Sequence, residues 1–548
     1  MAEFVPGVVN QDFLKLYRDV KGERKHVATL AFGDRIERGA KAGSWTTVRA
    51  PELFDGRGEW FVKGTLELRP PGALGVLRLS MVDVQQGDGL VLETPGGKIM
   101  LVDGGDNKLF ARHVAARYQH RRATAQRPLE VEAILVTHGD ADHFDGLNEL
   151  RRSEELPVSK ASKRVFLHPK RVLHNGLVKR PSELDGRRVP DAQQFGSSSV
   201  DADGVTWATE LVDDPRSVPA SARNAAFDAW AASLDHWATR GPIDVRRVHA
   251  DSDPGDVFDF LLRENVGVEL LGPIQEQTST PAGSVPALRF FGAPRKSPEL
   301  HLEHGESAGG QPSASHTING HSVALRLSYG NVRFLLTGDL NHAALERLLE
   351  HIAGTPERGS VGDRLEAEVV KAPHHGSHEF SAGALAAMKP VVALVSSGDE
   401  SAFKEYIHPR ATLMAALGHA MRGDTGVVLC TELAAFFSYR QQAHGREALR
   451  DFFADHPKAS FTRDELVELF RGDGRPRAAN APSVAGAGSK GPDVFESFER
   501  TNFGIVHVRT DGERVLVFTH SGERGLNEAY RFAVSPSHAV QFENLVTQ

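Results

Sequence analysis

Short apolar runs alternate with helical patterns through the middle of the chain. The runs are separated by glycine-containing turns, and several of them end directly in polar residues. Apolar runs of this length bounded by turn signals predict buried strands, and their alternation with helical segments is typical of an α/β protein. The predicted strands lie within 77–105, 129–137, 164–168, 266–273, 323–330, 332–340, 368–377, 390–398 and 425–433.

Two longer segments interrupt this alternation. The first insertion, at about 180–260, contains a helical stretch in which Phe227, Trp230, Leu234 and Trp237 recur at three- and four-residue steps, a pattern that predicts a packing stripe. The second, at about 274–315, is rich in Gly, Ser and Pro, and we expect a long loop there, either functional or disordered.

Both ends of the chain differ from the middle. Within residues 1–73, short β runs carrying tryptophan at about 26–70 resemble a bacterial SH3-like barrel, which would be a binding module; a plain β extension explains the pattern equally well. Residues 441–548 read as a C-terminal extension. It contains a low-complexity linker or mobile loop at about 475–492 and a closing hairpin turning at Asp511, which we expect to flank the core.

Composition restricts the class of protein. A chain of 548 residues is long enough for a large core, and its net charge of −8 argues against a broad nucleic-acid-coating surface. The one basic cluster, at 112–122, is expected to be a solvated helix face. The single cysteine, Cys430, is expected in a buried strand. Without a membrane-spanning run or a signal peptide, we predict a cytoplasmic protein with no membrane partner.

The most polar loop of the middle region directly follows an apolar strand. It carries His138, Asp140, Asp142 and His143 within six residues. Lone-pair donors this crowded converge on a small volume, and carboxylates that close repel one another unless a cation lies among them. The loop therefore predicts a metal site, and we expect the following helix to begin at Leu147.

This run resembles the H-x-[HED]-x-D-H motif of the metallo-β-lactamase superfamily. Asp140 stands where the lactamase and glyoxalase branches have His and the flavodiiron branch has Glu. An oxygen-rich site accepts Mn²⁺ or Mg²⁺ as well as Zn²⁺, so we do not expect a β-lactamase.

Three turns before this loop narrow the resemblance. The segments D-V-Q-Q-G-D (83–88), P-G-G-K (95–98) and V-D-G-G (102–105) are similar to the metallo-hydrolase domain of ComEC-type competence proteins. The resemblance implies that Asp103, and with it Asp88, orients a ligand histidine. It also implies the αββα four-layer sandwich of the superfamily over residues 74–440. The chain has no membrane channel, so a DNA-uptake role does not carry over.

Two later strand ends resemble the family's T-G-D and K-x-P-H-H-G-S motifs. They deliver Asp339, and then His374 and His375. The resemblance implies that Asp339 bridges two metal ions, with His374 completing the shell and His375 as the alternative. It further implies that one ion binds His138 and Asp140, and the other Asp142 and His143.

Further residues near these motifs are expected at the site. Asn319 and Ser322 match an N-x-x-S segment that precedes a strand where other branches place a third metal-binding histidine. His316 and His321 beside it are candidate ligands or substrate contacts, although surface-loop histidines explain them equally well. 

The H-H-G-S motif and the segment after it supply the last candidates. Lys371 is expected to balance charge on a phosphate oxygen, or else to be a strand-edge solubilising lysine. Ser377 belongs to the same motif, and Tyr406 and His408 are expected to flank the substrate.

The sequence as a whole predicts a metal-dependent hydrolase. We expect two divalent ions, Zn or Mn, to activate a water that attacks phosphorus, with Asp142, Asp339 and Lys371 as the catalytic residues. The predicted substrate is nucleic acid or a small phosphodiester, and the N-terminal module is expected to contact a protein partner. The alternatives are a hydrolase of a small ester, lactone or phosphonate, or a metal-stabilised scaffold recruited through the SH3-like module.

Overall fold

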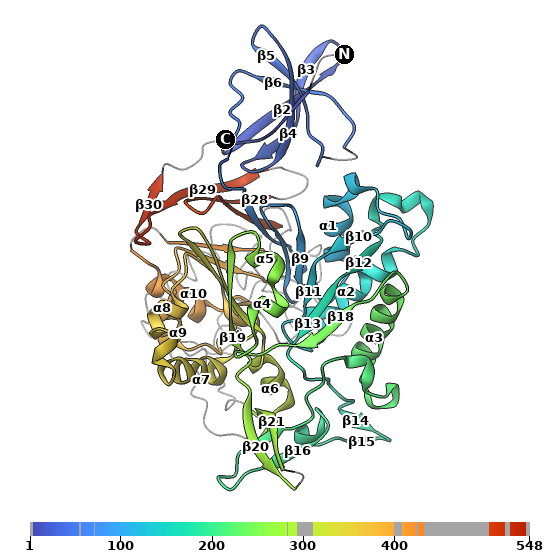
Figure 1. Ribbon diagram of the computed structural model, residues 1–548, viewed down its shortest axis with the longest axis vertical. Helices are drawn as coiled ribbons and strands as arrows, with labels where there is room; N and C mark the ends of the chain where they lie inside the picture. Colours follow the sequence, from blue (N-terminus) through green and yellow to red (C-terminus); the bar gives the residue numbers. More distant parts are fainter. Residues whose placement is uncertain are drawn as a thin grey trace, which may run out of the picture.

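Two large β-sheets share one apolar core at the centre of the protein (Figure 1). The computed structural model describes residues 4–53, 56–70, 72–281, 283–292, 311–398, 408–423, 426–431, 504–520 and 526–543. The first sheet consists, in spatial order, of β18 (Asp244–Arg247), β13 (Arg171–His174), β11 (Ala133–Leu135), β9 (Ile99–Asp103), β8 (Gly89–Glu93), β7 (Leu77–Met81), β27 (Ile505–Thr510), β28 (Arg514–His520), β29 (Leu526–Val534) and β30 (Val540–Glu543). The second consists of β19 (Val266–Gly272), β22 (Ala324–Tyr329), β23 (Val332–Leu336), β24 (Val369–Lys371), β25 (Val392–Val395) and β26 (Val427–Cys430).

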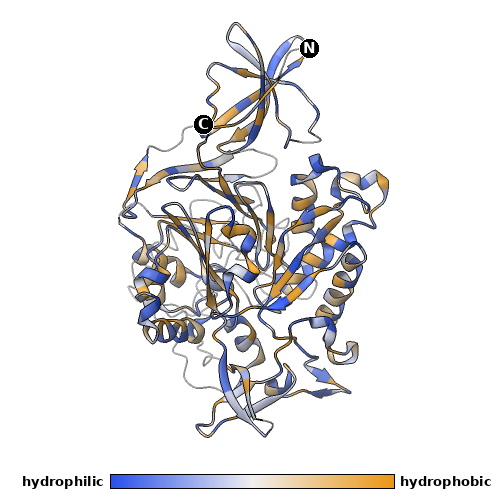
Figure 2. Ribbon diagram, viewed as in Figure 1, coloured by the Kyte–Doolittle hydropathy of each residue, from blue (hydrophilic) through white to orange (hydrophobic). Residues whose placement is uncertain are grey.

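The facing sides of the two sheets are apolar because side chains alternate along a strand. Leu77, Leu79 and Met81 of β7 and Leu325 and Leu327 of β22 all belong to the shared core. In Figure 2 the apolar colour runs along the central strands, whereas the helices carry it on part of their surface only. The predicted α/β class is therefore confirmed.

Helices cover the outer face of each sheet (Figure 1). No helix within the described residues combines the length and the apolar character needed to cross a membrane. The helices on the first sheet are α1 (Leu109–Arg117), α2 (Ala141–Ser153) and α3 (Ala225–Ala238), and those on the second are α7 (His342–Ala353), α8 (Val361–Leu365), α9 (Ala382–Met388) and α10 (Ala411–Ala420).

Cys430 lies in β26 at the edge of the second sheet, as predicted. It is buried, and burial raises the pKa of its thiol to about 12. The thiol therefore packs as a small apolar side chain and is not an activated nucleophile.

The sequence-based prediction is correct for part of the first insertion and wrong for part of the second. The aromatic stripe of 225–238 is buried against the first sheet, so the predicted packing role is confirmed. The predicted loop at 274–315 is wrong for 276–289, which form the hairpin β20–β21, while 293–310 lie outside the described residues. The remaining elements are α4 (Pro254–Val257), α5 (Asp259–Leu262), α6 (Ala314–Gly320), β10 (Leu129–Val131), β12 (Leu167–Pro169), β14 (Glu183–Leu184), β15 (Arg187–Arg188), β16 (Ser198–Val200), β17 (Thr206–Ala208), β20 (Glu276–Thr280) and β21 (Gly283–Arg289).

A separate six-stranded antiparallel sheet precedes this body and lies at its top in Figure 1. It has its own apolar core, built around Leu16, Val48 and Trp60. The sheet begins at Val5 and not near residue 26, because β1 and β2 also pair into it. Its strands are β1 (Val5–Val8), β2 (Phe13–Val20), β3 (Glu23–Ala31), β4 (Arg35–Ala42), β5 (Trp45–Arg49) and β6 (Trp60–Lys63).

The C-terminal hairpin is present with its predicted turn, but it does not merely flank the core. Strand β27 pairs with β7, and Val506 and Val508 belong to the core shared by the two sheets. The sheet therefore needs this segment for its completion. The predicted loop at 475–492 lies outside the described residues.

A buried cluster of opposite charges joins the N-terminal sheet to the body. Glu52 approaches Arg78 of β7 at 2.8 Å and Arg117 of α1 at 3.2 Å, and Glu93 lies 2.9 Å from Arg117. The expectation of a solvated helix face at 112–122 is therefore wrong for Arg117. Burial would raise the pKa of Glu52, but Arg78 and Arg117 outweigh it and lower the pKa to about 2.

Replacing Glu52 by Gln should destabilise the protein by on the order of 3 kcal/mol at neutral pH. The folded pKa of about 2 lies below the ordinary value of 4.5, so the contribution of Glu52 is complete above about pH 4.5 and is lost as the pH falls toward 2. Urea unfolding of wild type and E52Q at a series of pH values measures this difference, which should shrink in acid.

The matched control is Glu59→Gln, because Glu59 is half exposed and pairs with Arg49 on the surface of the same sheet. It should change the free energy of unfolding by less than about 1 kcal/mol at any pH. An E52Q deficit that does not depend on pH would contradict the assignment.

Candidate metal centre

The polar loop after β11 leads directly into α2. The helix begins at Ala141 and not at the predicted Leu147, with Asp140 as its N-cap. Asp is favoured at that position, and an acidic residue in the first turn complements the helix dipole. As a result, Asp142 and His143 lie on the first helical turn, where they have fixed directions.

Close backbone contacts hold this first turn against the preceding glycine turns. Gly104 donates to the carbonyl of His143 (2.7 Å), and a Cβ on Gly146 would lie 1.8 Å from the carbonyl oxygen of Gly104. A Cβ on Gly87 would lie 1.6 Å from the carbonyl oxygen of Asp142. The glycines of the motifs therefore allow the approach of the backbone to the polar loop.

The second sheet supplies the other half of the site. Asp339 follows β23, and His374 and His375 follow β24 in the short 3₁₀ turn Pro373–Gly376. Both histidines have a positive φ, 46° and 52°, which is costly for residues with a side chain. A hydrogen bond from the His374 amide to the Gly338 carbonyl (3.1 Å) holds this turn in place.

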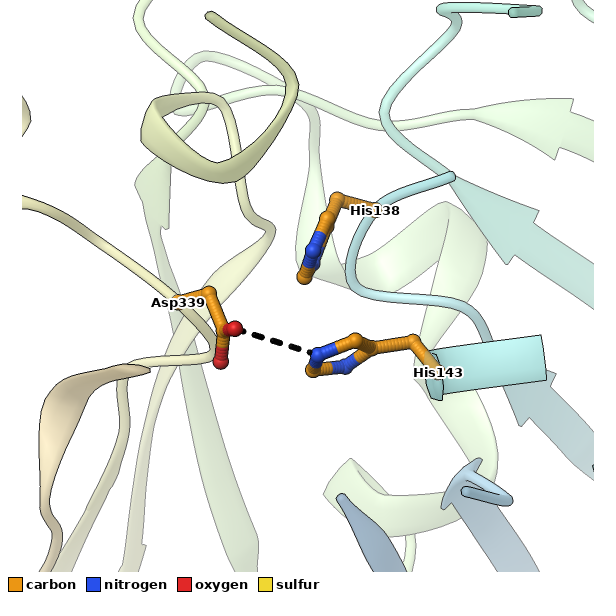
Figure 3. Close-up of side chains that lie close together, drawn as sticks. All are labelled: His138, His143 and Asp339. Atoms are coloured by element: carbon orange, nitrogen blue, oxygen red, sulfur yellow. Dashed lines mark ion pairs between the residues drawn. The ribbon is translucent and has the colours of Figure 1, made fainter. Parts of the chain in front are cut away.

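Imidazoles and carboxylates from the two sheets converge at one point. The Nε2 atoms of His143 and His375 lie 3.2 Å and 2.9 Å from Oδ2 of Asp339, and 3.2 Å from each other. Figure 3 shows His138 and His143 on one side of this point and Asp339 on the other. The groups whose ligand atoms all lie within 4.8 Å are His138–His143–Asp339, Asp142–His143–His375, Asp88–Asp339–His375 and Asp88–Asp103–His143.

Carboxylates behind the rings set the direction of two imidazoles. Nδ1 of His143 lies 2.8 Å from Asp103, and Nδ1 of His375 lies 3.2 Å from Asp88. Each carboxylate favours a proton on Nδ1 and leaves the lone pair of Nε2 directed toward Asp339. This is the tautomer that binds a metal ion, so the donor set fits a divalent cation.

The hydrogen-bond network gives His138 the same tautomer. Its Nδ1 lies 3.2 Å from both Thr137 Oγ1 and Ser322 Oγ. Thr137 donates its hydroxyl proton to Asp103, and Ser322 donates its own to the carbonyl of Asn319. Both oxygens therefore accept a proton from Nδ1 of His138, whose Nε2 keeps its lone pair.

Lys371 lies beneath this group with only 1% of its side chain exposed. Its ammonium is 2.5 Å from Asp88 and 3.5 Å from Asp339, and it donates to the carbonyl of Gly338 (2.8 Å). Burial would raise the pKa of Asp88, but Lys371 and His375 outweigh it and lower the pKa. The burial excludes a solubilising surface lysine, and the contacts favour a residue that positions Asp88 and Asp339.

Negative charge at the centre also acts on His375. Burial would lower the pKa of its imidazole, but Asp339 and Asp88 outweigh burial and raise the pKa to about 9. A position with this preference for positive charge attracts a proton or a metal ion, and the two compete for Nε2.

Other predicted residues lie near the centre without joining its groups. His374 approaches Asp339 only to 3.8 Å, so the geometry favours His375 as the ligand of the pair. His408 is buried, with its ring 5.9 Å from that of His374. The amide of buried Ser377 donates to the carbonyl of His374 (2.7 Å), which secures the turn. Tyr406 lies outside the described residues.

The two histidines of the segment before β22 point elsewhere. His316 lies 3.2 Å from Glu379, and its own carbonyl accepts from Asn341. His321 bonds to the carbonyl of Arg289 (2.7 Å) and lines a different cavity; burial lowers its pKa to about 4. Neither belongs to a metal-capable group among the described residues.

Three contacts at the site were not anticipated from the sequence. Lys179 lies 2.6 Å from Asp140, Gln86 donates to Asp142 (3.4 Å), and Thr137 contacts the ring of His138. Gln86 and Thr137 belong to recognised motifs, so their neighbourhood offered a signal. Lys179 follows β13 in a segment without any motif.

Comparison with known proteins agrees with the resemblance expected from the motifs. Residues 82–221 match the family model of the metallo-beta-lactamase superfamily. The competence protein ComA of Neisseria gonorrhoeae is 37% identical over 133 residues, which are 24% of this chain and 17% of that protein. The match thus spans about a sixth of the relative. The matched region contains His138 and His143, whereas Asp339 and His375 lie beyond it.

Replacing Asp103 by Asn should weaken Mn²⁺ or Zn²⁺ binding by about 10- to 100-fold, because the ring of His143 loses the carboxylate that orients it. Competition with a chelating dye measures the dissociation constant. Asp145→Asn, on the same helix but bonded to Asn148, should leave it unchanged. Equal affinities for wild type and D103N would contradict the role given to Asp103.

Proposed function

We propose that the metallo-beta-lactamase superfamily domain of this chain is a metal-dependent hydrolase of phosphodiesters, and that its helix-covered pair of sheets is the αββα sandwich of that superfamily. The observation that carries the proposal is the convergence of His143 and His375 on one oxygen of Asp339, beside Asp142. This arrangement joins strand ends from both sheets at one point.

The donor set favours a borderline or hard divalent ion. Two imidazoles share the site with the carboxylates of Asp142 and Asp339, a mixture that suits Zn²⁺ and Mn²⁺. A divalent ion bound there supplies Lewis-acid stabilisation of negative charge and makes a nearby water more acidic. The sequence predicts two such ions, with Asp339 shared between them.

Cationic groups around the centre support an anionic substrate. The Lys179 side chain is partly exposed beside Asp140. Arg410 follows His408, and its buried Nε has no hydrogen-bond partner among the described residues. A phosphodiester carries a negative charge that these groups stabilise, whereas an ester or lactone is neutral before attack. The phosphodiester is therefore preferred to the small-ester or lactone alternative.

Asp142 has the exposure that a proton acceptor needs. Its side chain is 24% exposed, while Asp339 and His375 beside it are almost fully buried. We assign to Oδ2 of Asp142 the proton of the attacking water, whose oxygen forms the new bond to phosphorus as the ester P–O bond breaks. The leaving oxygen then receives that proton. Gln86, which donates to the same oxygen, holds the carboxylate in place.

The second candidate function is partner binding by a metal-stabilised protein. The partner would be bound through the N-terminal sheet, whose sequence resembles an SH3-like module. A cluster of aromatic and cationic side chains on that sheet supports this second function. Tyr17 and Trp45 lie edge to face at 5.3 Å, and the guanidinium of Arg24 stacks on Trp45 and on Phe61 at 4.5 Å and 3.8 Å. Partly exposed aromatic rings with a cation between them are typical of binding surfaces for proteins and for nucleic-acid strands.

The experiment that tests hydrolysis is turnover of single-stranded DNA and of a generic aryl phosphodiester by the full chain with added Mn²⁺ or Zn²⁺. Asp142→Asn should lower kcat by about 100- to 10,000-fold at a metal concentration that saturates the variant, because it removes the proton acceptor. Asp256→Asn, which changes an exposed acidic residue in the first turn of α4, should have no effect.

Activity that depends on metal and is lost in D142N supports the phosphodiesterase. If wild type binds metal but cleaves neither substrate, the phosphodiester proposal fails. The binding protein is then the better description, and loss of partner capture in Trp45→Ala would be its test.

A further inference from the structure

Asp140 has a different environment from the other acidic residues of the motif. It stands at the N-cap position of α2 without a side-chain capping hydrogen bond, and none of the metal-capable groups among the described residues includes it. Its Oδ1 atom accepts a hydrogen bond from the ammonium of Lys179 at 2.6 Å. Both side chains are about four-fifths buried, at 20% and 22% exposure, so solvent screens this ion pair only weakly. The ammonium of Lys179 therefore already neutralises the Asp140 carboxylate, which the motif predicts to be a metal ligand.

The other oxygen of Asp140 faces the side-chain amide of Asn319. With its nitrogen directed to this position, the amide donates to Asp140 Oδ2 at 2.9 Å and to His138 Nε2 at 3.3 Å. The structure places the amide oxygen against these same acceptors, which repel it unless a cation lies among them, so the reversed amide is the stable orientation when no ion is bound. In the donating orientation the two amide hydrogens are shared among Asp140, His138 and the carbonyl of Ser315, which lies 3.2 Å away, so Asp140 gains a second hydrogen bond from the chain itself.

At the neighbouring group the positive charge comes from bound protons or from a metal ion. Nε2 of His143 and Nε2 of His375 lie 3.2 Å apart and both face Asp339, and Asp142 Oδ2 lies 3.8 Å from His375. Nδ1 of His143 bonds to Asp103 at 2.8 Å, and Nε2 of both rings lies against Asp339, so each Nε2 takes either a proton or a metal ion. A divalent ion supplies the positive charge of this group in place of the two protons.

We propose that the centre holds one divalent ion, bound by Asp142, His143, His375 and Asp339, and that the ammonium of Lys179 with the amide of Asn319 replaces a second ion at His138 and Asp140. Asp339 lies beside both metal positions. At the position of His138 and Asp140 the chain itself supplies a positive charge, the ammonium of Lys179, whereas at the position of Asp142, His143 and His375 the ion supplies it. The inference rests on the proposed function only in requiring a bound metal, and it corrects the number of ions expected from the motif.

The experiment counts ions in the full chain. Protein stripped with a chelator and equilibrated with Mn²⁺ should retain one Mn²⁺ per chain by elemental analysis. Its electron paramagnetic resonance spectrum should be that of an isolated ion, without the spin coupling of a pair. Neither readout depends on turnover.

An isosteric pair of variants locates the ion. Asp142→Asn should weaken Mn²⁺ binding by on the order of 100-fold, whereas Asp140→Asn should leave the stoichiometry at one. The reverse pattern, with the ion lost in D140N and kept in D142N, would overturn the proposal.

A double variant tests the replacement directly. Lys179→Met with Asn319→His removes the ammonium and provides a third imidazole near His138, so a second Mn²⁺ and a spin-coupled spectrum are expected. The control is Lys163→Met, which changes an exposed lysine. It should leave the stoichiometry at one Mn²⁺ per chain.

The outcomes separate this inference from the proposed function. Two ions in the wild type would overturn the single-ion centre and leave the hydrolase intact, whereas no bound ion would remove the basis of both. If circular dichroism shows that the double variant does not fold, the wild-type count and the D140N and D142N pair still decide the question.

Discussion

The balance of charge in a buried space governs the architecture of this centre. Asp88, Asp103 and Asp339 are each at most 2% exposed and lie around the same two imidazoles. Removing an ion from water costs several kcal/mol unless it is paired, so three neighbouring carboxylates require positive charge from within the fold. Lys371 provides one part of it, and the protons or metal at His143 and His375 provide the rest. Stability and metal affinity are consequently coupled.

The sequence carries enough information to locate most of this centre, because each of its side chains follows a buried strand. Asp103 ends β9, His138 follows β11, and Asp339 follows β23. Polar residues that follow apolar runs at one edge of a sheet must lie together once the runs are paired. The order of the strands could not be deduced from the pattern.

What the sequence did not reveal depends on partners that are distant along the chain. Lys179 has no motif, and its significance appears only when the fold places it on Asp140. Arg117 looks like one of several exposed basic residues until Glu93 and Glu52 surround it. The hairpin at 276–289 was missed because Pro281, Gly283 and Pro286 are turn signals in a segment that gains its order from pairing. In each case the sequence showed that the residues are polar, but it did not show which distant residues they contact.

The pairing of β27 with β7 has a consequence for how the protein acquires its structure. Val508 lies opposite Leu79, so the centre of the first sheet is closed by a segment that is distant along the chain. Until residues 505–510 leave the ribosome, β7 presents an unpaired edge of backbone donors and acceptors, which is prone to pairing with other chains. Contacts this distant in sequence also form slowly. The nascent chain is therefore expected to depend on chaperones until residues 505–510 are available, although the polar loop at 138–143 is complete early.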